Sequence, residues 1–302
     1  MRNEFIRHLT NLAEKDDSIC LLVGDLGYGV VENFEKKFPD RFFNLGVAEQ
    51  NMIGVASGLA SEGFHVFVYS IANFPIFRCA EQIRNDFCYH NQNVTIVSVG
   101  GGLSYGNLGY SHHAVQDYSF MRVLPNMKIF SPGDPNEVKI CLDFLCKNKS
   151  PSYLRLGKTG EKRISGPNEI ESPGKLREIH NSNSNTTAII TTGTTIQDIM
   201  EFKKSKKIPE EVDIFTCPVW GIDSQLEFEK ISHYKKIITV EDHLEQGGFG
   251  SWILEKMPIN LRNKLRIIGL SPKITGMVGS QKALNSAGGI NINRINSEIG
   301  DK

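Results

Sequence analysis

Short runs of apolar residues alternate with helical patterns along the first half of the chain. The predicted strands lie at 19–23, 66–69, 94–99, 127–130 and 153–156, and the predicted helices at about 48–61, 78–90 and 135–147. Strands that are apolar on both faces and separated by helices are typical of a parallel sheet with helices on both sides. The first half is therefore predicted to be a three-layer α/β domain with a parallel sheet.

The second half shows the same alternation after a change of composition. Between 161 and 186 the chain is rich in Gly, Pro, Ser, Asn and charged residues, which is typical of a linker. Strands are then predicted at 188–191, 213–216, 237–240 and 265–270, with helices beginning near Thr195 and after Gly247. We expect a first domain over 1–160, a linker over 161–186, a smaller three-layer α/β domain over 187–280 and a weakly structured tail over 281–302.

Composition narrows the protein class without naming a function. Lys and Arg together number 34, as do Asp and Glu, so no basic surface indicates a nucleic acid or an anionic membrane as a partner. No apolar run reaches the roughly 18–20 residues that span a bilayer, and the N-terminal pattern is an amphipathic helix rather than a signal peptide. The six cysteines form no CxxC pair. We expect a reduced, cytoplasmic protein that binds no metal through its own residues.

One acid stands at the predicted start of the helix over 48–61. Glu49 is followed by apolar and small residues, among them Gly54 and Gly58, that are typical of a helix buried nearly all round. An acid in the first turn of a helix is stabilised by the helix dipole, so a structural role is one interpretation. The other is a ligand site, because ligands bind at the carboxyl ends of parallel strands. A carboxyl group buried there would have a raised pKa and would bond a ring nitrogen or transfer a proton.

A glycine-rich loop over 98–117 follows a predicted strand. Its GGG is a weak phosphate-loop signal, and no GxGxxG with a downstream acid accompanies it, which disfavours a Rossmann site. Long loops of this kind often carry function. The adjacent His112 and His113 cannot face the same way, so one is expected in a site and the other packed or solvated. The alternative is a pair of surface histidines.

Two further segments have a structural and a functional interpretation. Phe74 and Phe77 come just before the predicted helix over 78–90, where aromatic residues are usually part of the core but would also wall a flat heterocycle. The segment 240–257, VEDHLEQGGFGSWILEKM, contains His243 and several acids after a strand of the second domain. Here we favour a structural role.

Taken in order, the segments resemble one family. GVAEQNMIGVASGL is similar to the GxAEQ segment that begins a helix of the pyrimidine-binding domain in the transketolase family. NFPIFRCAEQIRN, YSHHAVQD, VLPNMKIFSPGDPNEV and PSYLRLGK follow in that family's order, and VEDH with GGFGS resembles its C-terminal domain. The resemblance covers residues 2–270, and it is the combination that is specific. It implies a pyrimidine-binding domain followed by a transketolase C-terminal-like domain.

The resemblance also implies roles for individual residues. The glutamate that matches Glu49 binds N1′ of the aminopyrimidine ring of thiamine diphosphate and so activates the cofactor. Phe74 and Phe77 would wall the pyrimidine. His112 matches a histidine that contacts substrate oxygens. The cations Arg2 and Lys158 match groups that bind the substrate phosphate, although Lys158 stands where the family uses arginine and therefore lacks the bidentate fork.

One part of the family's machinery is missing from the sequence. Transketolases bind the diphosphate through Mg²⁺ on a domain with a GDG motif and a downstream Asn, whereas this chain has GDL at 24–26 and GDP at 133–135 but no GDG. The resemblance therefore implies the second half of a split transketolase. A separate N-terminal subunit would hold Mg²⁺ and the diphosphate, and the site would form between chains in an α₂β₂ assembly.

The substrate pocket departs from the family pattern. The chain has GNLGYSH where many transketolases have GEDGPTH, so that an acid is replaced by Leu108; Gly100 replaces a histidine, and Gly29 aligns near a serine. The leading hypothesis is transfer of a two-carbon ketol unit between sugars or sugar phosphates, with a remodelled sugar pocket. The alternatives are a decarboxylating carboligase similar to deoxyxylulose-phosphate synthase, the β chain of a 2-oxoacid dehydrogenase, and a non-catalytic scaffold subunit. The GVAEQNM segment disfavours the dehydrogenase.

Overall fold

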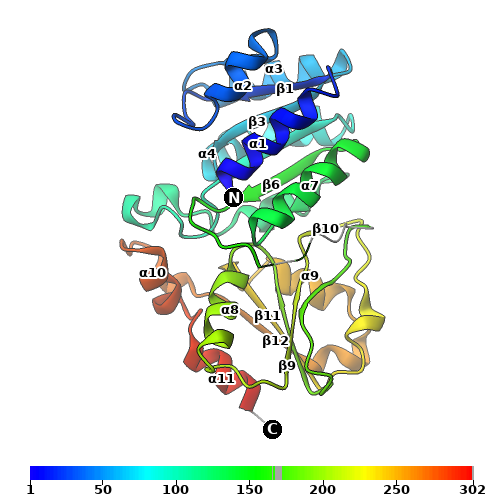
Figure 1. Ribbon diagram of the computed structural model, residues 1–302, viewed down its shortest axis with the longest axis vertical. Coiled ribbons are helices and arrows are strands. Elements are labelled where there is room, and N and C mark those ends of the chain that lie inside the picture. The colour runs from blue at the N-terminus through cyan, green and yellow to red at the C-terminus, as the bar shows by residue number, and fades with distance from the viewer. Residues whose placement is uncertain (165, 167–171, 301–302) are drawn as a thin grey trace.

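The structure is a computed structural model that describes residues 1–164, 166 and 172–300. In this part of the chain the strands form two sheets. The two sheets, each with its own helices, lie one above the other along the long axis of the molecule (Figure 1). The predicted α/β architecture with largely parallel sheets is therefore confirmed.

The first sheet, as far as the described residues show it, contains seven strands in the order β10-β5-β6-β4-β3-β1-β2. The strands are β1 (Ile19–Val23), β2 (Phe42–Asn44), β3 (His65–Ile71), β4 (Val94–Val99), β5 (Lys128–Phe130), β6 (Ser152–Leu156) and β10 (Val219–Gly221). The six strands from the first half of the chain are parallel, whereas β10 pairs with β5 in antiparallel orientation. A segment from the predicted second domain thus completes the first sheet, which the sequence did not indicate.

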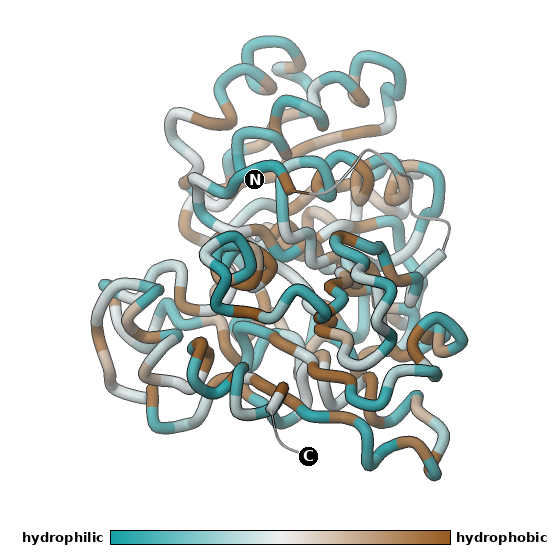
Figure 2. Tube along the Cα trace, turned by 60° about the horizontal axis from the view of Figure 1, so that its bottom comes forward, coloured by the Kyte–Doolittle hydropathy of each residue, from teal (hydrophilic) through white to brown (hydrophobic). Residues whose placement is uncertain are grey.

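Both faces of the first sheet are covered because its strands are apolar on both sides. The helices are α1 (Arg2–Ala13), α2 (Glu32–Lys37), α3 (Glu49–Ser61), α4 (Asn73–Arg78), α5 (Ala80–Gln82), α6 (Asp117–Met121) and α7 (Pro135–Lys147). In β1, Ile19, Leu21 and Val23 pack in the cluster that contains α1 and α7, whereas Cys20 and Leu22 pack in the cluster that contains α3 and α4. Teal and brown alternate along the coiled parts of the tube in Figure 2, as expected of helices that bury one face.

The second sheet has the order β12-β11-β8-β9-β7. Its strands are β7 (Arg177–His180), β8 (Thr187–Thr191), β9 (Val212–Thr216), β11 (Lys236–Leu244) and β12 (Leu265–Leu270). The helices of this half are α8 (Thr195–Lys204), α9 (Phe249–Lys256), α10 (Gln281–Gly288) and α11 (Ile292–Gly300). All pairings are parallel except that of β7 with β9.

The prediction of a weakly structured tail over 281–302 was wrong for the described residues up to 300. The Ser280 hydroxyl caps α10 by accepting from the backbone N–H of Ala283, and Gly289 ends that helix in the left-handed conformation. Leu284, Ile290 and Ile295 are buried in the core of the second domain. Only a few apolar residues of this segment pack in the core. Because small and polar residues surround them, the sequence pattern did not indicate the two helices.

Two other predictions need local correction. The linker predicted over 161–186 contains β7, an edge strand whose polar, partly exposed pattern differs from that of a core strand; residues 165 and 167–171 of it lie outside the described residues. The helix predicted over 78–90 is interrupted at Cys79 and continues as α5 and a π-helical segment, Ile83–Cys88. Phe74 and Phe77 lie inside α4 rather than before a helix.

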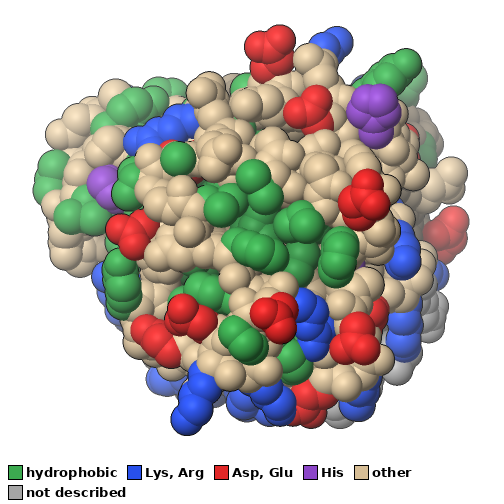
Figure 3. Space-filling view, turned by 90° about the horizontal axis from the view of Figure 1, so that it is seen from above, with side chains coloured by type: hydrophobic (Ala, Val, Ile, Leu, Met, Phe, Trp, Pro, Cys, Tyr) green, Lys and Arg blue, Asp and Glu red, His purple; other side chains and the backbone are tan. Residues whose placement is uncertain are grey.

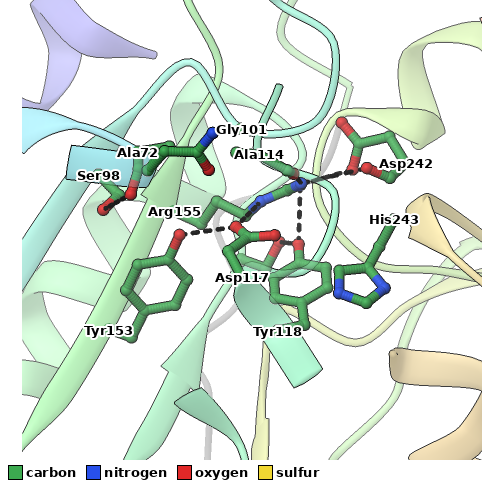
Figure 4. A network of polar contacts seen from close by, with 12 residues as sticks. Ala72, Ser98, Gly101, Ala114, Asp117, Tyr118, Tyr153, Arg155, Asp242 and His243 are labelled. Carbon is green, nitrogen blue, oxygen red and sulfur yellow. Dashed lines mark hydrogen bonds and ion pairs between the residues drawn. The ribbon is translucent and has the colours of Figure 1, made fainter. Parts of the chain in front are cut away.

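A buried arginine joins the two domains. Arg155 on β6 donates through Nε to the Asp117 carboxylate at 2.6 Å and through its terminal nitrogens to the Asp242 carboxylate at 2.5 Å and the Asp242 carbonyl at 3.1 Å (Figure 4). The remaining two N–H groups reach the Tyr118 hydroxyl and the Ala114 carbonyl. All five N–H donors of the guanidinium are therefore used. Since Asp242 lies on β11, this side chain connects the central part of both sheets.

Asp242 and His243 of segment 240–257 lie in the same junction, whereas Glu241 acts within the second domain; these roles agree with the structural interpretation. Glu241 accepts hydrogen bonds from the backbone N–H groups of Phe249 and Gly250 at the start of α9. His243 stacks on Tyr118 with ring centroids 5.3 Å apart, and its Nε2 lies 3.3 Å from the backbone N–H of Ser119. The segment fixes the second domain against α6 of the first.

A second buried histidine begins β3. His65 is 2% exposed, its Nε2 lies 3.2 Å from the Thr95 hydroxyl, and its ring packs on Phe67. Burial lowers the pKa of His65 to about 4; Asp16 raises it and Lys149 lowers it by smaller amounts. Because the folded protein holds this proton less tightly than the unfolded chain, the stability that neutral His65 provides is present above pH 6.5 and is lost as the pH falls towards 4.

We expect Arg155→Met to lower the free energy of unfolding by about 3–5 kcal/mol, because Asp117 and Asp242 would stay buried without their cation. Urea unfolding measures this change. Arg7→Met is the control, since Arg7 is half exposed and its partner Glu4 keeps Arg163, and it should cost less than about 1 kcal/mol. Equal losses in the two variants would contradict the role of the junction.

We expect the unfolding free energy of the wild type to include a His65 contribution that falls by about 2 kcal/mol between pH 7.5 and pH 5. His65→Gln should remove this part of the pH dependence. Thr95→Val removes the hydrogen-bond partner but keeps the titrating ring, so it should lower stability at pH 7.5 while retaining the slope. Urea unfolding at the two pH values distinguishes the variants, and an unchanged slope in His65→Gln would refute the assignment.

Candidate active site

Glu49 is the first residue of α3 and lies at the mouth of a surface pocket. The chain turns at Gly46, with φ +72°, after β2, and α3 begins three residues later. The Glu49 side chain is only 5% exposed, and its Oε1 accepts a hydrogen bond from the Arg78 guanidinium at 2.7 Å. The pocket has a volume of about 540 Å³ and is lined by Val47, Ala48, Glu49, Gln50, Asn51 and Arg78. Glu49 is thus a nearly buried carboxylate that borders open space.

Arg78 is a site residue that the sequence analysis did not single out. It ends α4, donates to Glu49, and lies 4.4 Å from the centroid of the Phe74 ring. The available signal was its spacing, because a cation four residues after an aromatic residue lies over it on a helix. The guanidinium therefore compensates the charge of the buried carboxylate and links it to an aromatic wall.

The two predicted aromatic residues have different surroundings. Phe74 meets the ring of His112 edge to face, with centroids 5.2 Å apart. Phe77 is 47% exposed and contacts Phe120 instead, at 6.3 Å. The structure therefore connects Glu49, through Arg78 and Phe74, to His112, whereas the ring contact of Phe77 is with Phe120.

The loop that carries His112 is held by both domains. A side chain at Gly101 would collide with the Arg155 guanidinium, and one at Gly102 with the Asp242 carboxylate. Two glycines of the GGG thus make room for the domain junction rather than for a phosphate. The backbone N–H of Gly279, just before α10, donates to the Gly106 carbonyl at 3.2 Å. The chain that leads into α10 therefore lies beside this loop and packs against it.

The adjacent histidines point in different directions. His113 is buried, and its backbone carbonyl accepts a hydrogen bond from the Asn73 side chain at 2.7 Å. His112 is partly exposed and lies against Phe74, with its Nδ1 3.0 Å from the Ser111 hydroxyl. His112 is therefore the histidine that a ligand would meet.

The two predicted cations lie near the other end of this loop. Arg2 is the first residue of α1, and Lys158 follows β6 with its Nζ 4.9 Å from the centroid of the Tyr105 ring. The charge of Arg2 also acts on Tyr105, which in turn lies 6.2 Å from His112. In the described part of the chain neither Arg2 nor Lys158 forms an ion pair, so both cations are available to an anion.

One face of α3 is open, which differs from the helix buried all round that the sequence suggested. Met52, Ile53 and Ala56 are buried, whereas Gly54 and Gly58 are exposed, with no atom within 4 Å of the position of an added Cβ. Partly exposed apolar residues on α3 and around β2 are Phe43, Leu45, Val55 and Leu59. Figure 3 shows hydrophobic side chains gathered at the centre of this end of the molecule, with charged side chains around them.

The site offers one heterocycle-binding group but no metal ligands. Glu49 is a nearly buried carboxylate that lines a pocket, and no described residue binds its second oxygen, which suits a flat ring that presents a nitrogen. Among residues 1–164, 166 and 172–300 no group of three His, Cys, Asp or Glu side chains is placed to hold a metal ion. Nor does this part of the chain contain a helix long and apolar enough to cross a membrane.

Comparison with known proteins identifies the family. Residues 1–160 match the model of the transketolase pyrimidine-binding domain. An apulose-4-phosphate transketolase subunit from Actinobacillus succinogenes is 31% identical over 92% of this chain and 90% of its own length. A putative transketolase C-terminal section from Methanocaldococcus jannaschii is 34% identical over 90% and 86% of the two chains.

More distant relatives and a solved structure agree with this result. A 1-deoxy-D-xylulose-5-phosphate synthase of Clostridium perfringens is 29% identical over 83% of this chain but only 41% of that protein. A solved split-gene transketolase, an inactive β4 tetramer, superimposes with a TM-score of 0.80 at 27% identity, covering 99% of this chain and 96% of the other. The chain belongs to the transketolase family.

Proposed function

We propose that the chain is one subunit of a thiamine diphosphate-dependent transketolase that transfers a two-carbon ketol unit between sugars or sugar phosphates. The observation that carries this proposal is the position of Glu49, a nearly buried carboxylate at the mouth of a pocket, in a chain without a GDG motif. The carboxylate suits the pyrimidine half of the cofactor. The diphosphate half and its Mg²⁺ are assigned to a separate N-terminal subunit.

The residues around Glu49 fit the pyrimidine ring of thiamine diphosphate. One carboxylate oxygen is bound by Arg78, which leaves the other to hold a proton shared with a ring nitrogen. Phe74 offers an apolar wall at the same site, and Phe77 extends it. When bound, the cofactor supplies the carbon nucleophile for carbonyl substrates. The chain holds the proton at the Glu49 carboxyl group. It also supplies the surface on which the pyrimidine ring binds and from which the ring excludes water.

The substrate side of the proposed site is formed by His112, Arg2 and Lys158. Burial lowers the pKa of His112, and the neighbouring His113 lowers it further, both of which favour the neutral ring. A neutral imidazole donates one hydrogen bond and accepts another, which suits hydroxyl and carbonyl oxygens of a sugar. Arg2 and Lys158 would bind an anionic group at the far end of the substrate.

We infer an assembly with the N-terminal subunit, as an α₂β₂ complex. The open, small-residue face of α3 begins at Glu49 itself, so a chain that covers it would also cover the pocket. A similar split-gene chain forms an inactive β4 tetramer, and another relative is named as one subunit of a transketolase, both of which support the need for a partner. All six cysteines are unpaired, which supports a reducing compartment such as the cytoplasm.

A second candidate function is a decarboxylating carboligase. It is favoured by the similarity to deoxyxylulose-phosphate synthases. Release of CO₂ from pyruvate by the complex distinguishes this reaction from ketol transfer.

We expect Glu49→Gln to reduce ketol transfer by the assembled complex about 10²- to 10⁴-fold, because the amide cannot hold and release the proton. The assay uses this chain, its N-terminal subunit, thiamine diphosphate, Mg²⁺ and a panel of ketose donors. Glu62→Gln, at the other end of α3, removes an exposed acid and should leave the rate unchanged. Full activity of Glu49→Gln would remove the catalytic assignment.

We expect Gly54→Arg to fold as the wild type but to fail to assemble with the N-terminal subunit, since its side chain has free space only until a partner covers α3. Gly54→Ala is the matched control and should assemble. Circular dichroism checks the fold, and size-exclusion chromatography with light scattering measures the complex. Normal assembly and activity of Gly54→Arg would place the interface elsewhere.

A further inference from the structure

Tyr105 occupies the space beyond the carboxyl end of the central strand of the first sheet. Gly100, with φ +85°, directly follows β4, and a side chain at Gly100 would overlap the ring of Tyr105. β4 has three strands on each side in the order of the sheet, and the ends of central parallel strands are where ligands bind. The Tyr105 ring is therefore built into the position where a substrate would meet the sheet.

Two cations without ion pairs in the described part of the chain converge on this ring. Lys158 follows β6, the neighbour of β4, and its Nζ lies 4.9 Å from the ring centroid. Burial raises the pKa of the Tyr105 hydroxyl, whereas the positive charge of Arg2 opposes that change. The Nε of Arg2 is buried and, among the described residues, has no hydrogen-bond partner. An unsatisfied buried donor costs free energy unless a ligand accepts from it.

The phenol itself is also without a partner. No described residue forms a hydrogen bond with the Tyr105 hydroxyl, although the ring is half-buried and lies 6.2 Å from His112. The ring thus stands between the histidine expected to meet the sugar and the cations expected to meet its charged end. Lys158 lies over its face, and no residue in the described ranges binds its hydroxyl.

We propose that Tyr105 is a specificity-determining residue that selects substrates ending in a phosphate monoester. Its ring holds the Lys158 ammonium by a cation–π contact, and its hydroxyl donates to the same phosphate that Lys158 and Arg2 bind. Selection follows because a phosphate monoester accepts from both cations and from the hydroxyl, whereas a neutral sugar gains no charge-assisted hydrogen bond there. The identity of the substrate as a sugar rests on the proposed function. The binding of a phosphate by Tyr105, Lys158 and Arg2 does not depend on it.

Two substitutions separate the ring from the hydroxyl. Tyr105→Phe keeps the ring over Lys158 and should raise the KM for ribose 5-phosphate about threefold to tenfold with kcat unchanged, as expected for one lost hydrogen bond. Tyr105→Leu removes both contacts and should raise it further, with a weaker dependence of KM on salt. The KM for ribose should not change in either variant. Tyr110→Leu, an exposed tyrosine of the same loop, is the control and should leave the ratio of the two KM values at the wild-type level.

Calorimetric binding of ribose 5-phosphate and ribose to the assembled complex, without a ketose donor, makes the outcome independent of turnover. Tighter binding of the phosphate ester that weakens in Tyr105→Phe supports the assignment, and if the complex then shows no ketol transfer, only the proposed function fails. If Tyr105→Leu performs ketol transfer with the wild-type preference for ribose 5-phosphate over ribose, the role of Tyr105 is overturned. The proposed function is then left intact. Equal affinity of the wild type for the two sugars also overturns it.

Discussion

The burial of Arg155 between Asp117 and Asp242 is the constraint on which the arrangement of the molecule depends. A guanidinium out of water requires a partner for each donor, and the partners come from the first sheet's own crossover, from α6 and from β11. The cost of any relative movement of the domains is therefore the loss of several charge-assisted hydrogen bonds at once. Because the loop before α6 passes over this junction, the position of His112 is set by both domains together.

The parts of the fold that were predicted from the sequence are those in which many neighbouring residues indicate the same element. The strands at 19–23 and 94–99 were found because mostly apolar runs of that length are buried on both faces. β7 and β10 were missed because short edge strands have a mixed pattern, and β10 joins a sheet far from it in sequence. Hydrophobic periodicity describes local burial and carries no information on such distant pairing.

In the site, too, features with a signal in the neighbouring sequence were predicted, and features that depend on contacts between distant residues were not. Glu49 at a helix start after a strand was a local signal, and the comparisons add the family to which that signal belongs. Arg78 was missed because its pairing with Glu49 joins residues on two helices. The GGG run was ambiguous because the reasons for Gly101 and Gly102 lie in Arg155 and Asp242, which are distant in the sequence. A glycine is informative only once the atom that approaches it is known.

The strand β10 also affects how the protein is made. Because β10 pairs with β5, the edge of the first sheet stays open on the ribosome until residue 221 has left the exit tunnel. An open strand edge is a template for pairing with another chain, and contacts between distant residues form slowly. The nascent chain therefore passes through a stage in which the first domain has nearly all of its residues but not its last strand. Chaperones that shield strand edges would act at this stage of synthesis.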